Sequence, residues 1–190
     1  LAVGRNLGAY IIAADILDIR SGPIFEWLKQ FTTRTLKHNN DGNQVTLRQS
    51  AWESASNAPA QEGFVQTALA VYLGDDELLD HSWICFRRYC GDTSSPHTFR
   101  DNNFGDDWQL DNSEQGRVAI LPKGAKINGV DVDGSLTNDM GRSNSEPKWP
   151  LTHRSESLYP WVGLNGAVFA ALVLHRQGYP AFEIQDRALL

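Results

Sequence analysis

The feature that most constrains the fold is a helical spacing of apolar residues, interrupted at short intervals by residues that end helices. Residues 7–20 carry apolar side chains about 3.6 residues apart, and Ser21 and Gly22 follow. Pro23 then stands in the first turn of a second expected helix, whose apolar face extends to Leu36. Two amphipathic helices joined by so short a break predict a helical hairpin.

The same arrangement recurs further along the chain. A third helix is expected from near Pro59 to a stop at Gly74, and a fourth follows at once, from Asp76 to Tyr89. The polar residues before them, 39–56, lack periodicity apart from one turn of helix at 47–52. The sequence thus predicts a second hairpin of the same kind.

The stretch 92–147 differs in composition, since Asn, Asp, Ser and Gly dominate it. We expect a long loop that contains a short β-hairpin; the segments with an extended pattern are 117–121 and 126–132. A helix from Tyr159 to Gln177 and a final helix from Pro180 close the chain. Four apolar residues are expected to anchor the loop: Phe99, Phe104, Trp108 and Ile120.

Length and composition indicate a single globular domain over residues 1–190, with the loop as an insertion. The paired helices predict an all-α fold, a partial α/α toroid of antiparallel hairpins. No apolar run reaches the ~20 residues of a membrane span; the longest is 167–174. No Met opens the chain, and its end carries an uncapped Leu189–Leu190 pair, so we expect a partial or processed chain that contacts another polypeptide segment or forms a homo-oligomer.

The net charge of −6 and the pI near 5.3 argue against a nucleic-acid-binding protein. An anionic ligand would therefore need a local cationic patch. The candidate residues are Arg87, Arg88, His97, Arg100, Lys148, His153 and Arg154.

The motifs predict neither a cofactor nor a metal site. Cys85 and Cys90 lack a second cysteine pair, and we expect both to be buried free thiols. Asp131 and Asp133 lie in a turn-like segment that lacks the closing Glu of a calcium loop. An alternative interpretation is a glycoside hydrolase that uses a pair of neighbouring acids, such as Asp106 and Asp107. Such a pair is poorly suited to this role, because the side chains of adjacent residues point in different directions.

The approach to the last long helix concentrates polar and aromatic side chains. One interpretation is a pocket for a polar, ring-shaped, anionic ligand; the other is that the rings fill the core while the cations are solvated. The residues concerned are Lys148, Trp149, His153, Arg154, Tyr159 and Trp161.

Five strings, in this order, resemble the alginate-lyase-like α/α-toroid polysaccharide lyases of bacteria. They are RNLGAYIIAAD (5–15), VYLGD (71–75), LPKGA (121–125), VDGSL (132–136) and YPWVGLNGA (159–167). The resemblance spans most of the chain. It implies an enzyme of the chondroitin AC/alginate lyase type that acts on uronate polymers outside the cell or in the periplasm.

Such a lyase breaks a uronic-acid glycosidic bond by β-elimination, which needs a group that neutralises the carboxylate and groups that move protons. The resemblance implies that Asn57, Gln61 and Arg100 hold the carboxylate. Gln61 stands where the family has a His, and because Gln cannot act as a base, that role passes to His97, His153 or Tyr159, or the site is inactive. The residues assigned to substrate binding are His97, Trp108, Lys148, Trp149, Arg154 and Trp161, with the three tryptophans stacking on sugar faces.

The sequence therefore predicts a protein that binds an acidic polysaccharide and is able to cleave it by β-elimination. In this picture Tyr159 and His153 exchange the proton. The alternative is a non-catalytic carbohydrate-binding or structural assembly subunit on a lyase-derived scaffold.

Overall fold

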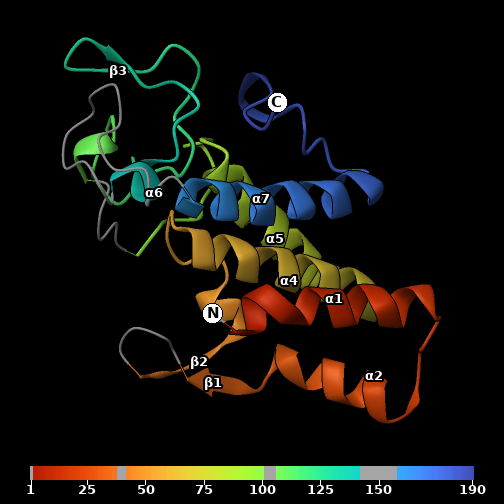
Figure 1. Ribbon diagram of the computed structural model, residues 1–190. Helices are drawn as coiled ribbons and strands as arrows, with labels where there is room; N and C mark the ends of the chain where they lie inside the picture. The colour runs from red at the N-terminus through yellow and green to blue at the C-terminus, as the bar shows by residue number, and fades with distance from the viewer. Residues whose placement is uncertain (1, 38–41, 101–105, 142–157) are drawn as a thin grey trace.

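The computed structural model describes residues 2–37, 42–100, 106–141 and 158–190, and these residues are mostly helical (Figure 1). The helical content confirms that part of the fold prediction. The α-helices are α1 (Ala2–Ile16), α2 (Gly22–Lys29), α3 (Leu47–Ser50), α4 (Asn57–Leu73), α5 (Asp76–Tyr89), α6 (Thr137–Gly141) and α7 (Leu158–Arg176). Short 3-10 helices lie at Gln30–Thr32 (η1), Asp106–Trp108 (η2) and Ile184–Asp186 (η4).

Two small antiparallel sheets complete the described part of the chain. Strand β1 (Thr35–Lys37) pairs with β2 (Gln44–Thr46), and β3 (Lys126–Ile127) pairs with β4 (Val130–Asp131). Both sheets are peripheral to the helices in Figure 1. The core is therefore built from helices and from the loop that lies over their ends.

Helix α4 is the central element, because α1, α5 and α7 all pack against it (Figure 1). It ends at Gly74, whose left-handed backbone (φ 67°) lets its N–H reach the carbonyls of Ala70 and Val71. The next residue, Asp75, caps α5 by accepting a 2.9 Å bond from the backbone N–H of Leu78. This pair of caps produces the tight turn that folds α5 back along α4.

Helix α7 runs parallel to α4. Gly163 lies so close to the start of α4 that a Cβ placed on it would be 3.4 Å from the Cα of Asn57. Two turns further along α4 and α7, the rings of Phe64 and Phe169 lie 5.3 Å apart. Contacts that advance in the same direction along both helices require a parallel pair.

Helix α1 is parallel to α4 as well, on another side of it. A Cβ on Gly4 would lie 3.1 Å from the backbone nitrogen of Glu62, while Arg20, just beyond the end of α1, donates to the carbonyl of Tyr72 at 3.3 Å. Helices α1, α4 and α7 thus begin at one end of the bundle, which we call the start end (Figure 1).

Helices α2 and α5 run in the opposite direction and return the chain to the start end (Figure 1). The Gln66 side chain of α4 donates to Ser82 of α5 at 3.0 Å inside this packing. The C-terminal end of α5, at Tyr89, consequently lies beside the first turns of α4 and α7.

Helix α7 is the one helix among the described residues with the length and apolar composition of a membrane span. A helix in the core of a water-soluble protein has the same properties, and α7 packs against α4 and α5. The finding is weak evidence for a membrane protein.

The short hairpin expected in the loop after α5 is present, and it lies within the second of the two extended segments. Strands β3 and β4 form a hairpin within 126–131, whereas Ile120 pairs with Leu136 across an isolated bridge. Helix α6 follows and was not expected. The anchoring role of Phe99, Trp108 and Ile120 is confirmed, since all three are buried; Phe104 lies outside the described residues.

The prediction of a final helix from Pro180 is wrong. Turns and η4 take its place, because Gln185, Asp186 and Arg187 have positive φ angles, which end helical geometry. Leu189 packs against the main core cluster, so only Leu190 of that pair is exposed. The second helix also ends early, at Lys29, and η1 and then β1, which ends at Lys37, follow it.

Candidate functional site

The start end gathers several of the predicted site residues on three elements. Asn57 is the first residue of α4 and is 3% exposed. Its side-chain Nδ2 donates a 2.8 Å hydrogen bond to Oδ1 of Asp139, which α6 supplies from 82 positions further along the chain. The predicted carboxylate-binding amide therefore already contacts a carboxylate of this chain.

Tyr89 and Gly163 also lie close to Asp139. A Cβ on Gly163 would lie 2.9 Å from Oδ2 of Asp139 and 3.1 Å from the Tyr89 hydroxyl, so only a glycine leaves room for both groups. Burial and the neighbouring Asp139 carboxylate raise the pKa of Tyr89 well above its usual value. Tyr89 is consequently a neutral phenol at physiological pH.

Gln61 lies one helical turn beyond Asn57 on α4. Its Oε1 is buried and has no hydrogen-bond partner among the described residues. A buried amide oxygen of this kind is a ready acceptor for a donor on a ligand or a water molecule.

Tyr159 and Trp161 stand in the first turn of α7 and are 36% and 68% exposed. Tyr159 precedes Gly163 by four residues, so both occupy the same face of α7. That face meets the start of α4 at Asn57. The structure thus brings Tyr159 to the same end of the bundle as Asn57 and Gln61, at its solvent-exposed rim.

His97 lies beneath the segment that leads into α4. Its Nε2 donates to the Trp52 carbonyl at 2.8 Å, because a carbonyl can only accept, and its Nδ1 lies 3.4 Å from the thiol of Cys85. Burial lowers the pKa of His97, and the Arg88 charge adds to the shift. Both ring nitrogens are occupied, so His97 is poorly suited to act as the base.

Cys85 and Cys90 are both buried free thiols, which confirms the sequence prediction. Burial raises the pKa of Cys85 to about 12. The thiol of Cys85 therefore stays protonated and donates toward His97, which fixes the tautomer of the imidazole.

Arg100 and Trp108 are placed less favourably for the predicted roles. Arg100 is exposed; its Nη1 lies 3.8 Å from a carboxylate oxygen of Glu53, and its backbone N–H donates to the Glu53 carbonyl at 2.9 Å. Trp108 is 0% exposed and packs among Val118 and Leu121, so its ring faces the interior rather than a sugar. The four predicted residues that lie outside the described part of the chain are Lys148, Trp149, His153 and Arg154.

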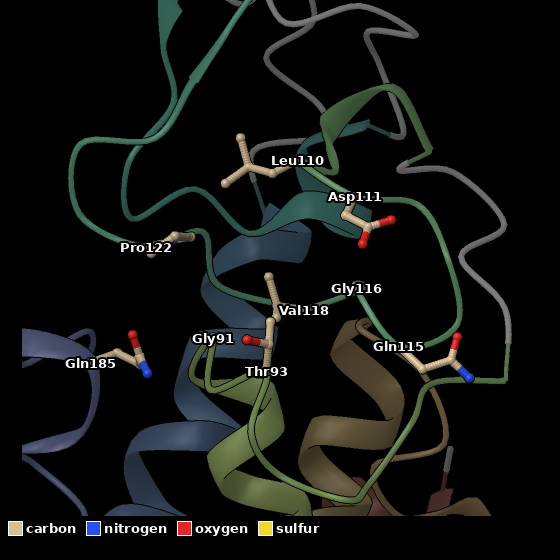
Figure 2. Close-up of a pocket in the computed structure, with 9 residues that line it drawn as sticks. All are labelled: Gly91, Thr93, Leu110, Asp111, Gln115, Gly116, Val118, Pro122 and Gln185. Atoms are coloured by element: carbon tan, nitrogen blue, oxygen red, sulfur yellow. The ribbon is translucent and has the colours of Figure 1, made fainter.

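A separate open pocket of about 440 Å³ lies between the loop after α5 and the C-terminal segment (Figure 2). Asp111 and Gln185 are among the polar side chains at its rim, and Val118 contributes apolar surface. None of its lining residues belongs to the predicted site. The lining residues are Gly91, Thr93, Leu110, Asp111, Gln115, Gly116, Val118, Pro122 and Gln185.

Tyr89 and Asp139 are the site residues that the sequence did not reveal. Tyr89 reads as one more residue of an amphipathic helix, and Asp139 lies in a polar stretch without periodicity. Among the described residues, no group of three or more His, Cys, Asp or Glu side chains is placed to hold a metal ion.

Comparison with protein-family models, with curated proteins and with solved structures finds no match for this chain. The family resemblance seen in the sequence therefore gains no support from these comparisons. The functional argument depends on the geometry of the start end.

Proposed function

We propose that this chain binds a uronate-containing polysaccharide at the start end of the bundle and cleaves it by β-elimination. The observation that supports the proposal is that α4, which carries Asn57 and Gln61, and α7, which carries Tyr159, begin at the same end of the bundle and approach closely there at Gly163. Amides neutralise a carboxylate without supplying a competing base, and a tyrosine is able to move protons.

The parallel packing of α1, α4 and α7 adds to this argument. Each helix directs the positive end of its dipole toward the start end, which favours an anionic ligand there despite the net charge of −6. Parallel helices that alternate with antiparallel returns are also the arrangement of an α/α toroid, so we propose that the chain is part of one.

In the proposed reaction a base removes the proton at C5 of the uronate, and the electron pair forms the C4–C5 double bond. The bond to the O4 leaving group breaks, and O4 takes up a proton. Tyr159 takes part in this exchange, together with His153, and the amides stabilise the charge that develops on the carboxylate. Because such polymers occur outside cells, we propose a secreted, extracellular or periplasmic location.

The test is incubation with alginate, glucuronan and a glycosaminoglycan while the ultraviolet absorbance of the unsaturated product is followed. Tyr159→Phe should lower the rate by about 10²-fold or more, the usual contribution of a proton-transferring side chain. Tyr10→Phe is the matched control, since Tyr10 is an exposed tyrosine on α1. Equal rates for the two variants would refute the assignment of Tyr159.

A specific observation favours the second candidate, a non-catalytic binding subunit. Both ring nitrogens of His97 are engaged, so this histidine does not supply the base. Retained binding of a uronate polymer without an unsaturated product from any member of the panel would support this alternative.

A further inference from the structure

We infer that Asp139 is a positioning residue that fixes the Asn57 amide for recognition of a uronate carboxylate. The inference rests on the function proposed above and adds a residue to it. It starts from a contact between two buried side chains, since Asn57 and Asp139 are 3% and 0% exposed and are joined by a 2.8 Å bond.

The carboxyl oxygen of Asp139 that accepts from Asn57 selects one of the two orientations of the Asn57 amide. In the observed orientation Nδ2 faces the carboxylate and donates to it. The flipped amide would place its carbonyl oxygen against a carboxylate oxygen, two acceptors without a proton between them. The carboxylate therefore excludes the flipped state, and the second N–H of the amide keeps a fixed direction.

The two partners are held by separate elements, and each element has its own contacts to the rest of the fold. Asn57 lies in the first turn of α4, the helix at the centre of the bundle. Helix α6 is tied to the loop below it through Thr137, whose backbone N–H donates to Ala119 at 2.9 Å and whose hydroxyl donates to Val118 at 2.9 Å. Asp139 thus cannot follow the amide if the amide rotates.

The absence of a side chain at Gly163 makes this arrangement possible. A Cβ there would lie 2.9 Å from Oδ2 of Asp139, which is closer than real Cβ contacts allow. The first turn of α7, which carries Tyr159, therefore approaches the Asn57–Asp139 pair directly. The fixed amide and the proposed proton-transferring residue belong to one assembly.

The experiment compares Asp139→Ala and Asp139→Asn with Asp107→Asn, an exposed carboxylate on η2. One measurement follows the side-chain amide signals of Asn57 by ¹H–¹⁵N NMR, assigned with Asn57→Ala. The second measures the affinity for alginate oligosaccharides and for a neutral oligosaccharide of the same length. Far-ultraviolet circular dichroism checks that each variant is folded. If Asp139→Ala does not fold, the comparison is made with Asp139→Asn, which keeps the volume of the side chain.

We expect Asp139→Ala to shift the Asn57 amide signals and to weaken alginate binding roughly ten- to hundredfold, the contribution of a hydrogen bond to a charged group. Asp139→Asn should have a smaller effect on the amide signals and on alginate affinity, because its carbonyl oxygen still accepts a hydrogen bond. Binding of the neutral oligosaccharide should not change in either variant. Amide signals that do not respond to Asp139, or undiminished alginate affinity once the amide contact is lost, would overturn the inference. A wild-type chain that binds no uronate would instead refute the proposed function. The two failures can be told apart, because the amide signals report on the contact between Asn57 and Asp139 without any ligand.

Discussion

His97 donates a hydrogen bond to the Trp52 carbonyl across 45 residues, and this bond joins the loop after α5 to the segment that leads into α4. This setting favours the neutral imidazole of His97 over the protonated one. A second proton on the imidazole would lie against the Cys85 thiol and near the Arg88 charge, in a buried setting. The segment that positions Asn57 is thereby linked to the charge of a histidine.

The first prediction concerns stability against pH. Because the folded protein lowers the pKa of His97 and of His81, their contribution is complete above about 6.5, the unfolded value, and is lost as the pH falls toward the folded values. The pKa of Asp92 is also lowered, but from 3.8, so it acts at more acidic pH. Urea unfolding should be measured from about pH 7.5 to about pH 5, on both sides of the unfolded histidine pKa. The free energy of unfolding should fall as the pH is lowered.

The variant His97→Gln should flatten this pH dependence in part, since it keeps a donor for the Trp52 carbonyl and does not titrate. The exposed His175→Gln is the control and should leave the profile unchanged. If His97→Gln shows the full wild-type slope, the dependence comes from another group.

The second prediction concerns the close approach of α7 to α4. A Cβ on Gly166 would lie 2.7 Å from the backbone of Ala60, and backbone atoms cannot rotate away. Gly166→Ala should therefore lower the free energy of unfolding by about 1–3 kcal/mol, despite the better helix propensity of alanine. Asn165→Ala, an exposed neighbour, should change it by less than about 0.5 kcal/mol. Chemical denaturation decides, and a stabilised Gly166→Ala would contradict the close approach of the two backbones at this position.

The third prediction concerns the thiols. Burial raises the pKa of both Cys85 and Cys90, so neither forms the thiolate that reacts with disulfide reagents. An aromatic disulfide reagent should release almost no chromophore from the native chain and two equivalents in denaturant. Fast release of one equivalent from the native protein would show that one of the thiols is accessible.

The fourth prediction concerns Arg88, which is almost fully buried beneath the loop. Its guanidinium donates to the carbonyls of Thr93, at 3.0 Å, Glu114, at 3.3 Å, and Gln115. A lysine cannot reach three carbonyls at once, so Arg88→Lys should cost about 1–3 kcal/mol and expose the loop to proteases.

The matched control is Arg48→Lys, whose exposed pair with Glu77 should contribute less than about 1 kcal/mol. Limited proteolysis followed by mass spectrometry locates the cleavage. Unchanged resistance of 92–118 in Arg88→Lys would show that the loop is held by other contacts.

Local signals predicted α4 and α5 well, because each boundary depends on nearby residues. Gly74 and Asp75 act within one turn of the helices that they end and begin, so their roles follow from sequence. The end of the chain shows the limit of such signals. Pro180 is compatible with a helix start, yet the following residues adopt turns and pack against the core instead.

For the same reason the positions of some candidate site residues in the fold could be predicted, while their roles stay a prediction. Asn57, Gln61 and Tyr159 lie at helix starts that periodicity can find. Asp139 lies on a helix of five residues, and its contact with Asn57 spans 82 positions, which no local pattern encodes. Long-range contacts of this kind depend on how the loop settles on the bundle, and so on tertiary packing.

The parallel arrangement of α1, α4 and α7 also gives the two ends of the bundle connections of different length. At the far end the turn between α4 and α5 is tight, whereas the long connections from α2 to α4 and from α5 to α7 meet at the start end. Insertions and exchanges in those connections would alter the surface around Asn57 without disturbing the helices below. Changes of length in those connections would therefore reshape one end of the bundle and leave the tight turn at the other end as it is.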